Sequence, residues 1–164
     1  FLEKMENPVT NQINAGCYVF NPRVISTIPL DTVVSVERET FPQLVANGAK
    51  VFGFVEAAYW LDIGTPKALL KASTDIVLRN GPGLVMPDAV VDSTASITGG
   101  SCVGRGSTVG AGTQIHGSIV EAGAVIGRDV VIENSFVATG AVIDDGAKIG
   151  STFVTKGEIL PIPL

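Results

Sequence analysis

Hydrophobic positions in the second half of the chain recur with a period of six. The β-branched residues are Val85, Val91, Ile97, Val103, Val109 and Ile115. Small residues stand four places after each of the first five, at Ala89, Ala95, Ser101, Ser107 and Thr113. This period fits neither an α-helix nor a simple alternating strand. It predicts a chain that runs straight for a few residues, turns and repeats, so that each sixth residue points inward.

The pattern is typical of a left-handed parallel β-helix, in which three hexapeptides form one triangular coil. Glycines between the apolar positions suit turns with positive φ. About eleven hexapeptides follow one another, which predicts between about three and four coils. Each buried Val or Ile contributes about 1.5–3 kcal/mol, enough in sum for a stable core. Prolines after Ile159 leave the period and are expected to blunt the open end.

The register of the repeat slips after Ile115, and two alternatives follow. One continues as Ile119, Val125, Val131, Val137, Ile143 and Ile149. It turns Asp129 inward, where a buried charge is costly. The other continues as Val120, Ile126, Ile132, Val137, Ile143 and Ile149. It uses two five-residue steps, keeps Asp129 outside and brings Phe136 inward; we favour it.

The first 80 residues lack this period and mix short strands with helices. Runs rich in Val, Ile and aromatic residues predict strands at 12–20, 51–55 and 58–63. Helices are expected at 22–28 and 31–47. In the second helix Ser35 is the expected cap, Glu37 and Glu39 complement the helix dipole, and Pro42 predicts a kink or a restart.

A further helix is expected from Pro66 to about Arg79. Thr65 caps it, and Leu69, Ala72 and Ile76 share its predicted buried face. The sequence therefore predicts an α/β part, residues 1–80, followed by an all-β β-helix, residues 81–164.

Composition excludes several classes of function. A net charge of −5 and a pI near 4.8 argue against a nucleic-acid partner. No apolar run reaches the roughly 18 residues of a membrane span, and the first residues do not resemble a signal peptide. Cys17 and Cys102 are expected to be reduced, which favours the cytoplasm. The chain begins without methionine, in what reads as the middle of a strand, and we interpret it as a fragment.

A β-helix alone does not name a function, and one alternative is a hexapeptide acyltransferase. Such an enzyme needs a catalytic histidine in the coils, and His116 is the only histidine. It follows an inward-facing residue, so we expect it to project outward near a turn and favour an exposed polar role. A zinc site with about three histidines is excluded. A further alternative is a non-catalytic assembly or regulatory module.

Four short segments before the repeat carry more information. Phe1-Leu2-Glu3-Lys4, Asn14-Ala15-Gly16 and Trp60-Leu61-Asp62-Ile63-Gly64-Thr65-Pro66 resemble the F-x-E-K-P, N-A-G and W-x-D-x-G-T-P motifs of sugar-phosphate nucleotidyltransferases. Residues 35–42, SVERETFP, look like the S-I-E-x-E-x-F-P segment of mannose-1-phosphate guanylyltransferases. In several members of the family a left-handed β-helix follows directly, so the resemblance covers the whole chain.

The resemblance implies an enzyme that joins a sugar 1-phosphate to the α-phosphate of a nucleoside triphosphate and releases pyrophosphate. It makes Lys4 the catalytic cation on the sugar phosphate and Glu3 an acceptor for sugar hydroxyls. Asn14 and Gly16 would bind the sugar, and Asp62 would bind Mg²⁺. Positioning and cationic stabilisation of the transition state suit this chemistry.

The chain departs from the family in two ways. Met5 stands where a proline usually follows Lys4, which leaves Lys4 itself intact. The G-G-x-G-T-R-L nucleotide loop and the first metal-binding Asp are absent and are expected upstream of Phe1. The fragment is therefore expected to be inactive alone, within an intact parent that uses GTP and mannose 1-phosphate. Glucose-1-phosphate uridylyl-, adenylyl- and thymidylyltransferases stay open as alternatives, and a homo-oligomer formed through the β-helix is expected.

Overall fold

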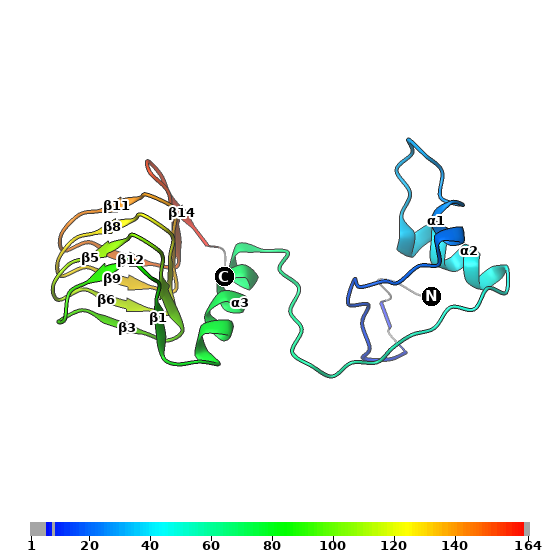
Figure 1. Ribbon diagram of the computed structural model, residues 1–164, viewed down its shortest axis with the longest axis horizontal. Coiled ribbons are helices and arrows are strands. Elements are labelled where there is room, and N and C mark those ends of the chain that lie inside the picture. The colour runs from blue at the N-terminus through cyan, green and yellow to red at the C-terminus, as the bar shows by residue number, and fades with distance from the viewer. Residues whose placement is uncertain (1–5, 8, 163–164) are drawn as a thin grey trace. The chain divides into compact units, whose positions relative to one another are not determined.

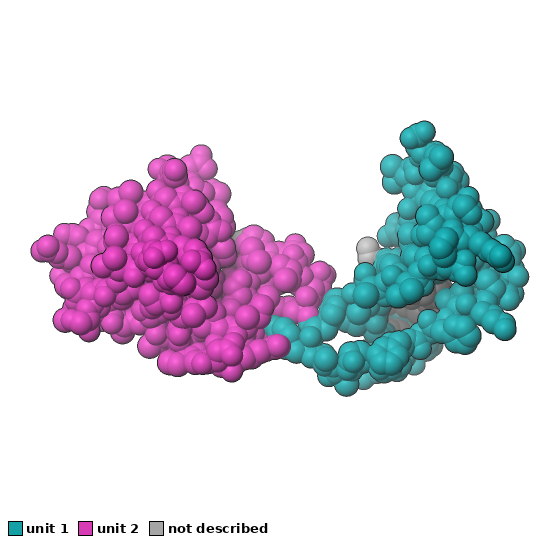
Figure 2. Space-filling model, in the orientation of Figure 1, with its two compact units in different colours: residues 1–60 teal, residues 61–164 magenta. Residues whose placement is uncertain are grey.

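The computed structural model describes residues 6–7 and 9–162. The chain forms two compact units, residues 1–60 and residues 61–164, which are described separately (Figure 2). Among the described residues, no helix combines the length and the apolar character needed to cross a membrane.

Unit 1 contains three short helical elements: α1 (Pro22–Ile25), η1 (Val36–Thr40) and α2 (Phe41–Ala46). Ser35 Oγ accepts from the Arg38 N–H at 3.2 Å, and the Glu39 carboxylate accepts from the Ser35 N–H at 3.0 Å. These bonds satisfy donors at the start of the helix. The segment changes from one π-helical stretch to an α-helix at Phe41, beside Pro42, where a kink or restart was expected.

The strands predicted at 12–20 and 51–55, and that at 58–63 spanning the two units, are wrong. The described residues of these segments form no strand. An extended segment becomes a strand only when a neighbour receives its backbone N–H and C=O groups, and no described segment pairs with these. These segments therefore have high β-propensity but no neighbouring strand to pair with among the described residues.

Unit 2 contains α3 (Pro66–Leu78) and a parallel β-solenoid of about four turns, hereafter the β-helix (Figure 1). The first sheet runs in the order β1 (Gly83–Val85), β4 (Ser101–Val103), β7 (Ile119–Val120), β10 (Phe136–Val137), β13 (Thr152–Val154) and β14 (Ile159–Pro161). The second sheet comprises β2 (Val90–Val91), β5 (Thr108–Val109), β8 (Val125–Ile126) and β11 (Val142–Ile143). The third comprises β3 (Ser96–Thr98), β6 (Gln114–His116), β9 (Val131–Glu133) and β12 (Lys148–Gly150). Among the described strands only β14 pairs antiparallel, and it covers the edge of β13.

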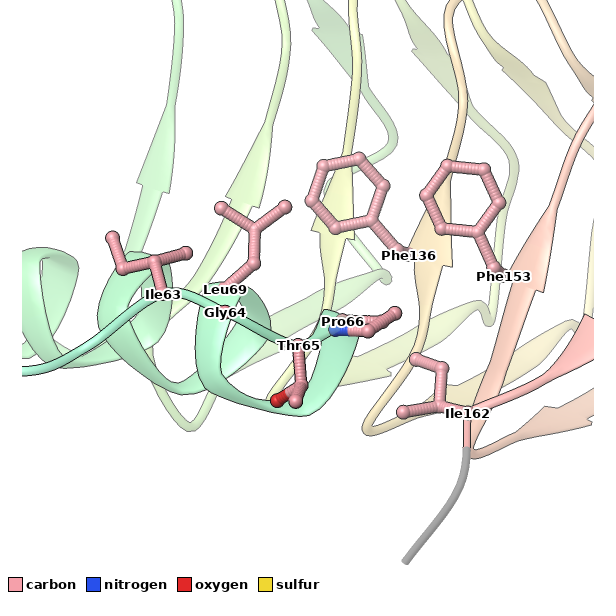
Figure 3. Close-up of a pocket in the computed structure, with 8 residues that line it drawn as sticks. All are labelled: Ile63, Gly64, Thr65, Pro66, Leu69, Phe136, Phe153 and Ile162. Carbon is pink, nitrogen blue, oxygen red and sulfur yellow. The ribbon is translucent and has the colours of Figure 1, made fainter. Parts of the chain in front are cut away.

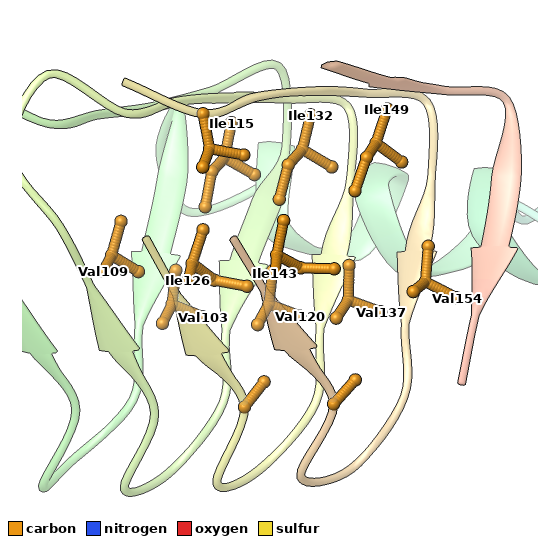
Figure 4. Close-up of a cluster of buried hydrophobic side chains, with 13 residues drawn as sticks. Val103, Val109, Ile115, Val120, Ile126, Ile132, Val137, Ile143, Ile149 and Val154 are labelled. Carbon is orange, nitrogen blue, oxygen red and sulfur yellow. The ribbon is translucent and has the colours of Figure 1, made fainter. Parts of the chain in front are cut away.

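The second register alternative is confirmed. Its inward residues are buried, as Figure 4 shows: Val120, Ile126, Ile132, Val137, Ile143 and Ile149. Asp129 is exposed. A further five-residue step, from Ile149 to the buried Val154, was not foreseen. Val85, in the first coil, is 46% exposed because no earlier coil covers it.

The prediction that Phe136 turns inward is wrong. Ser135 and Val137 are both fully buried, so alternation along the strand sends Phe136 outward. There its ring stacks on Phe153 of the next coil, with centroids 5.2 Å apart and planes 10° apart.

The register slip lies at one corner of the coil. Val85 pairs with Val103, eighteen residues later, whereas Val103 pairs with Val120, seventeen residues later. The shortened corner, between the third and first sheets, contains Gly117, Asn134 and Ser151 in successive coils. All three have positive φ, at 57°, 47° and 51°.

Buried hydroxyl groups connect the coils at this corner. Ser118 N–H donates to Ser101 Oγ at 3.0 Å, and Ser135 N–H donates to Ser118 Oγ at 3.0 Å. Thr152 N–H continues the series to Ser135 Oγ at 3.1 Å. We call this series the hydroxyl ladder. Among the described residues, Thr152 Oγ1 is buried without a hydrogen-bond partner at the end of the ladder.

Helix α3 packs on the outer side of the first sheet. Its buried residues are Leu70, Ala72 and Val77, whereas Leu69 and Ile76 of the predicted face are 39% and 57% exposed. Leu70 and Val77 are seven residues apart and so share one side of the helix. Because α3 packs here, compactness divides the chain at residue 60 and not at residue 80. The assignment of residues 1–80 to one sequence domain stays a prediction.

Candidate functional site

The predicted site residues fall in three places. Glu3 and Lys4 lie outside the described residues. Asn14 and Gly16 lie in unit 1, and Asp62 lies in unit 2. Asn14 and Asp62 therefore belong to different units.

Asn14 is held by side chains from two segments. Its Nδ2 donates to the Tyr18 hydroxyl at 2.5 Å and, by a shorter contact, to Glu37 Oε1. The Tyr18 hydroxyl donates to the same Glu37 oxygen at 2.7 Å. Asn14 Oδ1 accepts from the Gly16 N–H at 3.1 Å, which forms a local turn. Gly16 has φ of 72°, a conformation that glycine adopts without strain.

A third segment reaches the same turn. Trp60 Nε1–H donates to the Ala15 carbonyl at 3.2 Å. Residues of the N-A-G motif, of the segment 35–42 and of the W-x-D-x-G-T-P motif therefore meet within unit 1. We call Asn14, Tyr18, Glu37 and Trp60 the Asn14 cluster.

Aromatic packing holds one side of this cluster. The Tyr18 ring lies edge-on to Phe41, with centroids 5.0 Å apart, and edge-on to Phe20 at 6.0 Å. Phe20 and Phe41 stack at 5.7 Å. The buried Phe41 opens α2, so that helix fixes the ring that carries the Tyr18 hydroxyl.

The cluster offers a carboxylate, an amide and a hydroxyl at a partly exposed surface. Such a set of donors and acceptors suits a polyhydroxylated ligand. From the sequence, Glu37 is predicted only to complement the helix dipole, and no role is predicted for Tyr18. The signal for Glu37 was present in the resemblance of residues 35–42 to a family segment, which carried no assigned role.

Asp62 is exposed and lies three residues before the Thr65 cap of α3. A Cβ placed on Gly64 would lie 3.6 Å from either carboxylate oxygen, so the carboxylate lies alongside Gly64. Thr65 Oγ1 accepts from the Ala68 N–H at 3.1 Å, and Pro66 occupies the first turn of the helix. These features fix the start of α3 close to Asp62.

The donor at Asp62 fits a magnesium ion of the kind bound mainly by substrate. Mg²⁺ keeps several waters and takes one or two carboxylates plus substrate phosphates. The described part of the chain has no group of three or more His, Cys, Asp or Glu residues arranged to hold a metal.

An apolar pocket of about 220 Å³ lies beside this segment, within unit 2 (Figure 3). It is lined by Ile63, Gly64, Thr65, Pro66, Leu69, Phe136, Phe153 and Ile162. Only Thr65 contributes a polar side chain, so the pocket has no set of converging catalytic groups.

His116 lies outward at the end of β6, as predicted. Its Nδ1 lies 3.1 Å from Thr98 Oγ1 of the preceding coil. The contact is between exposed side chains on the third sheet.

A comparison with protein-family models matches residues 1–78 to the model described as nucleotidyl transferase. Residues 1–78 belong to the nucleotidyl transferase family. A mannose-1-phosphate guanylyltransferase of Mycobacterium tuberculosis is 48% identical over 130 residues, which cover 73% of this chain and 36% of that protein. A mannose-1-phosphate guanyltransferase of Yarrowia lipolytica is 36% identical over 110 residues, covering 60% of the chain and 30% of that protein. Mannose-1-phosphate guanylyltransferase 1 of Arabidopsis thaliana is 32% identical over 129 residues, covering 73% and 35%.

The chain spans about a third of the length of these relatives. The similarity to the Mycobacterium protein extends beyond the family match, because 73% of the chain is more than its first 78 residues. The predicted family and the predicted order, nucleotidyl transferase sequence followed by a β-helix, are confirmed. The roles of Glu3, Lys4, Asn14, Gly16 and Asp62 stay predictions.

Proposed function

We propose that this chain forms the sugar 1-phosphate side of an enzyme that joins mannose 1-phosphate to GTP, forming GDP-mannose and pyrophosphate. The similarity to mannose-1-phosphate guanylyltransferases over 73% of the chain supports the reaction. The observation that carries the proposal is the meeting of three motif segments in the Asn14 cluster.

In the proposed mechanism the chain binds and orients the sugar phosphate. Asn14 and Glu37 direct the sugar hydroxyls, while Glu3 accepts further hydrogen bonds. Lys4 holds the attacking phosphate as a compact positive charge, so that its oxygen lies in line with the nucleotide α-phosphate. Asp62 would hold Mg²⁺, which supplies charge neutralisation on the transferring phosphates when bound.

The test uses the protein at the natural length that carries this chain. Pyrophosphate release is measured with GTP, ATP, UTP and dTTP, each with mannose 1-phosphate and with glucose 1-phosphate. We expect GTP with mannose 1-phosphate to have the highest kcat/KM. A clear preference for another pair would replace the guanylyl assignment with one of the glucose-1-phosphate alternatives.

Substitution of the predicted site residues separates binding from chemistry. Lys4→Ala is expected to lower kcat/KM by about 100-fold or more, because it removes the charge on the attacking phosphate. Asn14→Ala is expected to raise the KM for the sugar phosphate by about 10-fold. Activity that survives both changes would overturn the assignment of this side of the site.

The acyltransferase alternative rests on His116 and its contact with Thr98. His116→Ala separates the two classes. Lost acetyl-CoA turnover would favour an acyltransferase, whereas unchanged pyrophosphate release would favour nucleotidyl transfer.

Self-association through the β-helix is part of the proposal. An exposed row on the second sheet, Val90, Thr108, Val125 and Val142, supports it, because three of its four residues are apolar. Light scattering of the natural-length protein tests it, and a monomer would exclude it. Two free cysteines, Cys17 and Cys102, support the proposed cytoplasmic location.

A further inference from the structure

The first sheet of the β-helix carries apolar residues on its outer side. They lie in register in successive coils: Leu84, Cys102, Ile119, Phe136 and Phe153. The corresponding outward row on the third sheet is polar, with Thr98, His116 and Glu133. The outward row of the second sheet, Val90, Thr108, Val125 and Val142, is exposed, whereas α3 packs on the apolar row of the first sheet (Figure 1).

The length of α3 matches the width of the sheet that it covers. Thirteen helical residues extend about 20 Å. The five parallel strands β1, β4, β7, β10 and β13 span about 19 Å. The Thr74 carbonyl, in the second half of α3, lies against Gly100 beside β4, where a Cβ would approach it to 2.5 Å. The start of α3 correspondingly lies at the other end of the row, against β10 and β13.

Phe136, Phe153 and Ile162 form the surface on which the start of α3 packs, hereafter the seat. Phe136 and Phe153 stack with centroids 5.2 Å apart. Ile162 is 7% exposed, and its N–H donates to the Ser151 carbonyl at 2.8 Å. Figure 3 shows these side chains beside the segment that contains Ile63 and Pro66. Asp62 directly precedes Ile63.

We propose that Phe136 and Phe153 are positioning residues that hold the Asp62 carboxylate for Mg²⁺, with Ile162 completing their seat. The inference rests on the proposed role of Asp62 as a magnesium ligand. The last coils of the β-helix thereby set the metal affinity of a transferase site that they do not themselves enter. Apolar packing acts on the backbone of Ile63 and Pro66, and the backbone fixes where the neighbouring carboxylate lies.

The test compares Phe136→Ala and Ile162→Ala with Ile159→Ala in the natural-length protein. Ile159 lies on β14, is 64% exposed and lies outside the pocket, so its truncation is the matched control. We expect the Mg²⁺ concentration for half-maximal activity to rise about 10-fold in the first two variants and to stay unchanged in the control. The kcat at saturating Mg²⁺ should return to near its original value. Phe136→Leu, which retains apolar volume, should restore most of the metal affinity.

Terbium binding gives a readout that does not depend on turnover. Trp60, the only tryptophan of this chain, stands two residues before Asp62, and its excitation can sensitise bound Tb³⁺. The Tb³⁺ affinity should weaken with Phe136→Ala and with Ile162→Ala. Circular dichroism checks that each variant folds. If Phe136→Ala unfolds, Ile162→Ala still tests the same packing, because it truncates a different residue of the pocket.

Asp62→Asn separates this inference from the function on which it rests. If Asp62→Asn weakens Tb³⁺ and Mg²⁺ binding but the two pocket variants behave as the control does, the positioning role is overturned and the metal assignment stands. If Asp62→Asn changes neither, Asp62 is not a metal ligand and the positioning role fails with it. The nucleotide panel still tests the transferase reaction independently.

Discussion

Replacement of Ser118 by alanine tests whether the hydroxyl ladder holds the coils together. Ser118 is fully buried; its hydroxyl accepts from the Ser135 N–H at 3.0 Å and donates to the His116 carbonyl at 2.8 Å. Alanine leaves the Ser135 N–H buried without its acceptor, which costs about 1–3 kcal/mol. The His116 carbonyl still accepts from the Asn134 N–H at 3.0 Å, so its loss adds little.

The short corner makes this loss hard to repair. At the longer corners the equivalent N–H donates to a hydroxyl of the preceding coil where one is present, as the Ala124 N–H does to Ser107 Oγ at 3.2 Å. Where no hydroxyl is present it turns back on its own coil, as the Ala141 N–H does to the Ala138 carbonyl at 3.1 Å. Only two residues, Glu133 and Asn134, separate Ile132 from Ser135. If the Ser135 N–H bonded three residues back, its acceptor would be the carbonyl of Ile132, which is already an inward-facing strand residue. We therefore expect Ser118→Ala to lower the free energy of unfolding by about 2 kcal/mol.

Urea unfolding followed by circular dichroism measures this difference. Ser96→Ala is the matched control, because Ser96 lies outward and exposed on β3. Surface substitutions of this kind change stability by less than about 0.5 kcal/mol. Equal stabilities of the two variants would refute the idea that the hydroxyl ladder stabilises the β-helix.

The remaining predictions concern the other packed features. Glu37→Gln should raise the KM for the sugar phosphate about 10-fold, with little change in kcat, because it weakens the charge-assisted bond to Asn14; an unchanged KM in steady-state assays would contradict this. Gly100→Ala should destabilise the fold by about 2 kcal/mol more than Gly106→Ala in thermal unfolding, since both have positive φ but only Gly100 meets a helix carbonyl. Burial raises the pKa of the Cys102 thiol, so its alkylation by iodoacetamide should accelerate only at higher pH than for an ordinary thiol, as mass spectrometry can show; rapid alkylation at neutral pH would be the contrary result.

The hexapeptide period predicted the β-helix because every inward position is repeated many times. Charge burial then chose between the two registers through a single residue, Asp129. The period did not predict that Phe136 faces outward. Its direction follows from Ser135, which is the small inward residue of the shortened step, and the spacing alone does not identify Ser135 as that residue. The buried face of α3 was likewise chosen wrongly, since Leu69 and Leu70 are adjacent and equally apolar. Only the position of the sheet decides between them.

The motifs predict roles for Asn14 and Asp62 because each motif assigns one role to one residue. The structure describes the surroundings of both residues, and their roles stay predictions. The contact between Asn14 and Glu37 spans 23 positions, and no periodicity reports such a contact. Predicted strands such as 12–20 failed for the related reason that pairing depends on a second segment.

The match between α3 and the five strands of the first sheet has an evolutionary consequence. The unpaired Thr152 hydroxyl could accept the N–H of a further coil, so duplication of one seventeen-residue turn would extend the stack without chemical conflict. An added coil lengthens the row by about 4.8 Å, which about three helical residues span. Lineages that gain or lose a coil should therefore also gain or lose about three residues in α3. The two segments would then vary in length together, although 50 or more residues can separate an inserted coil from the helix.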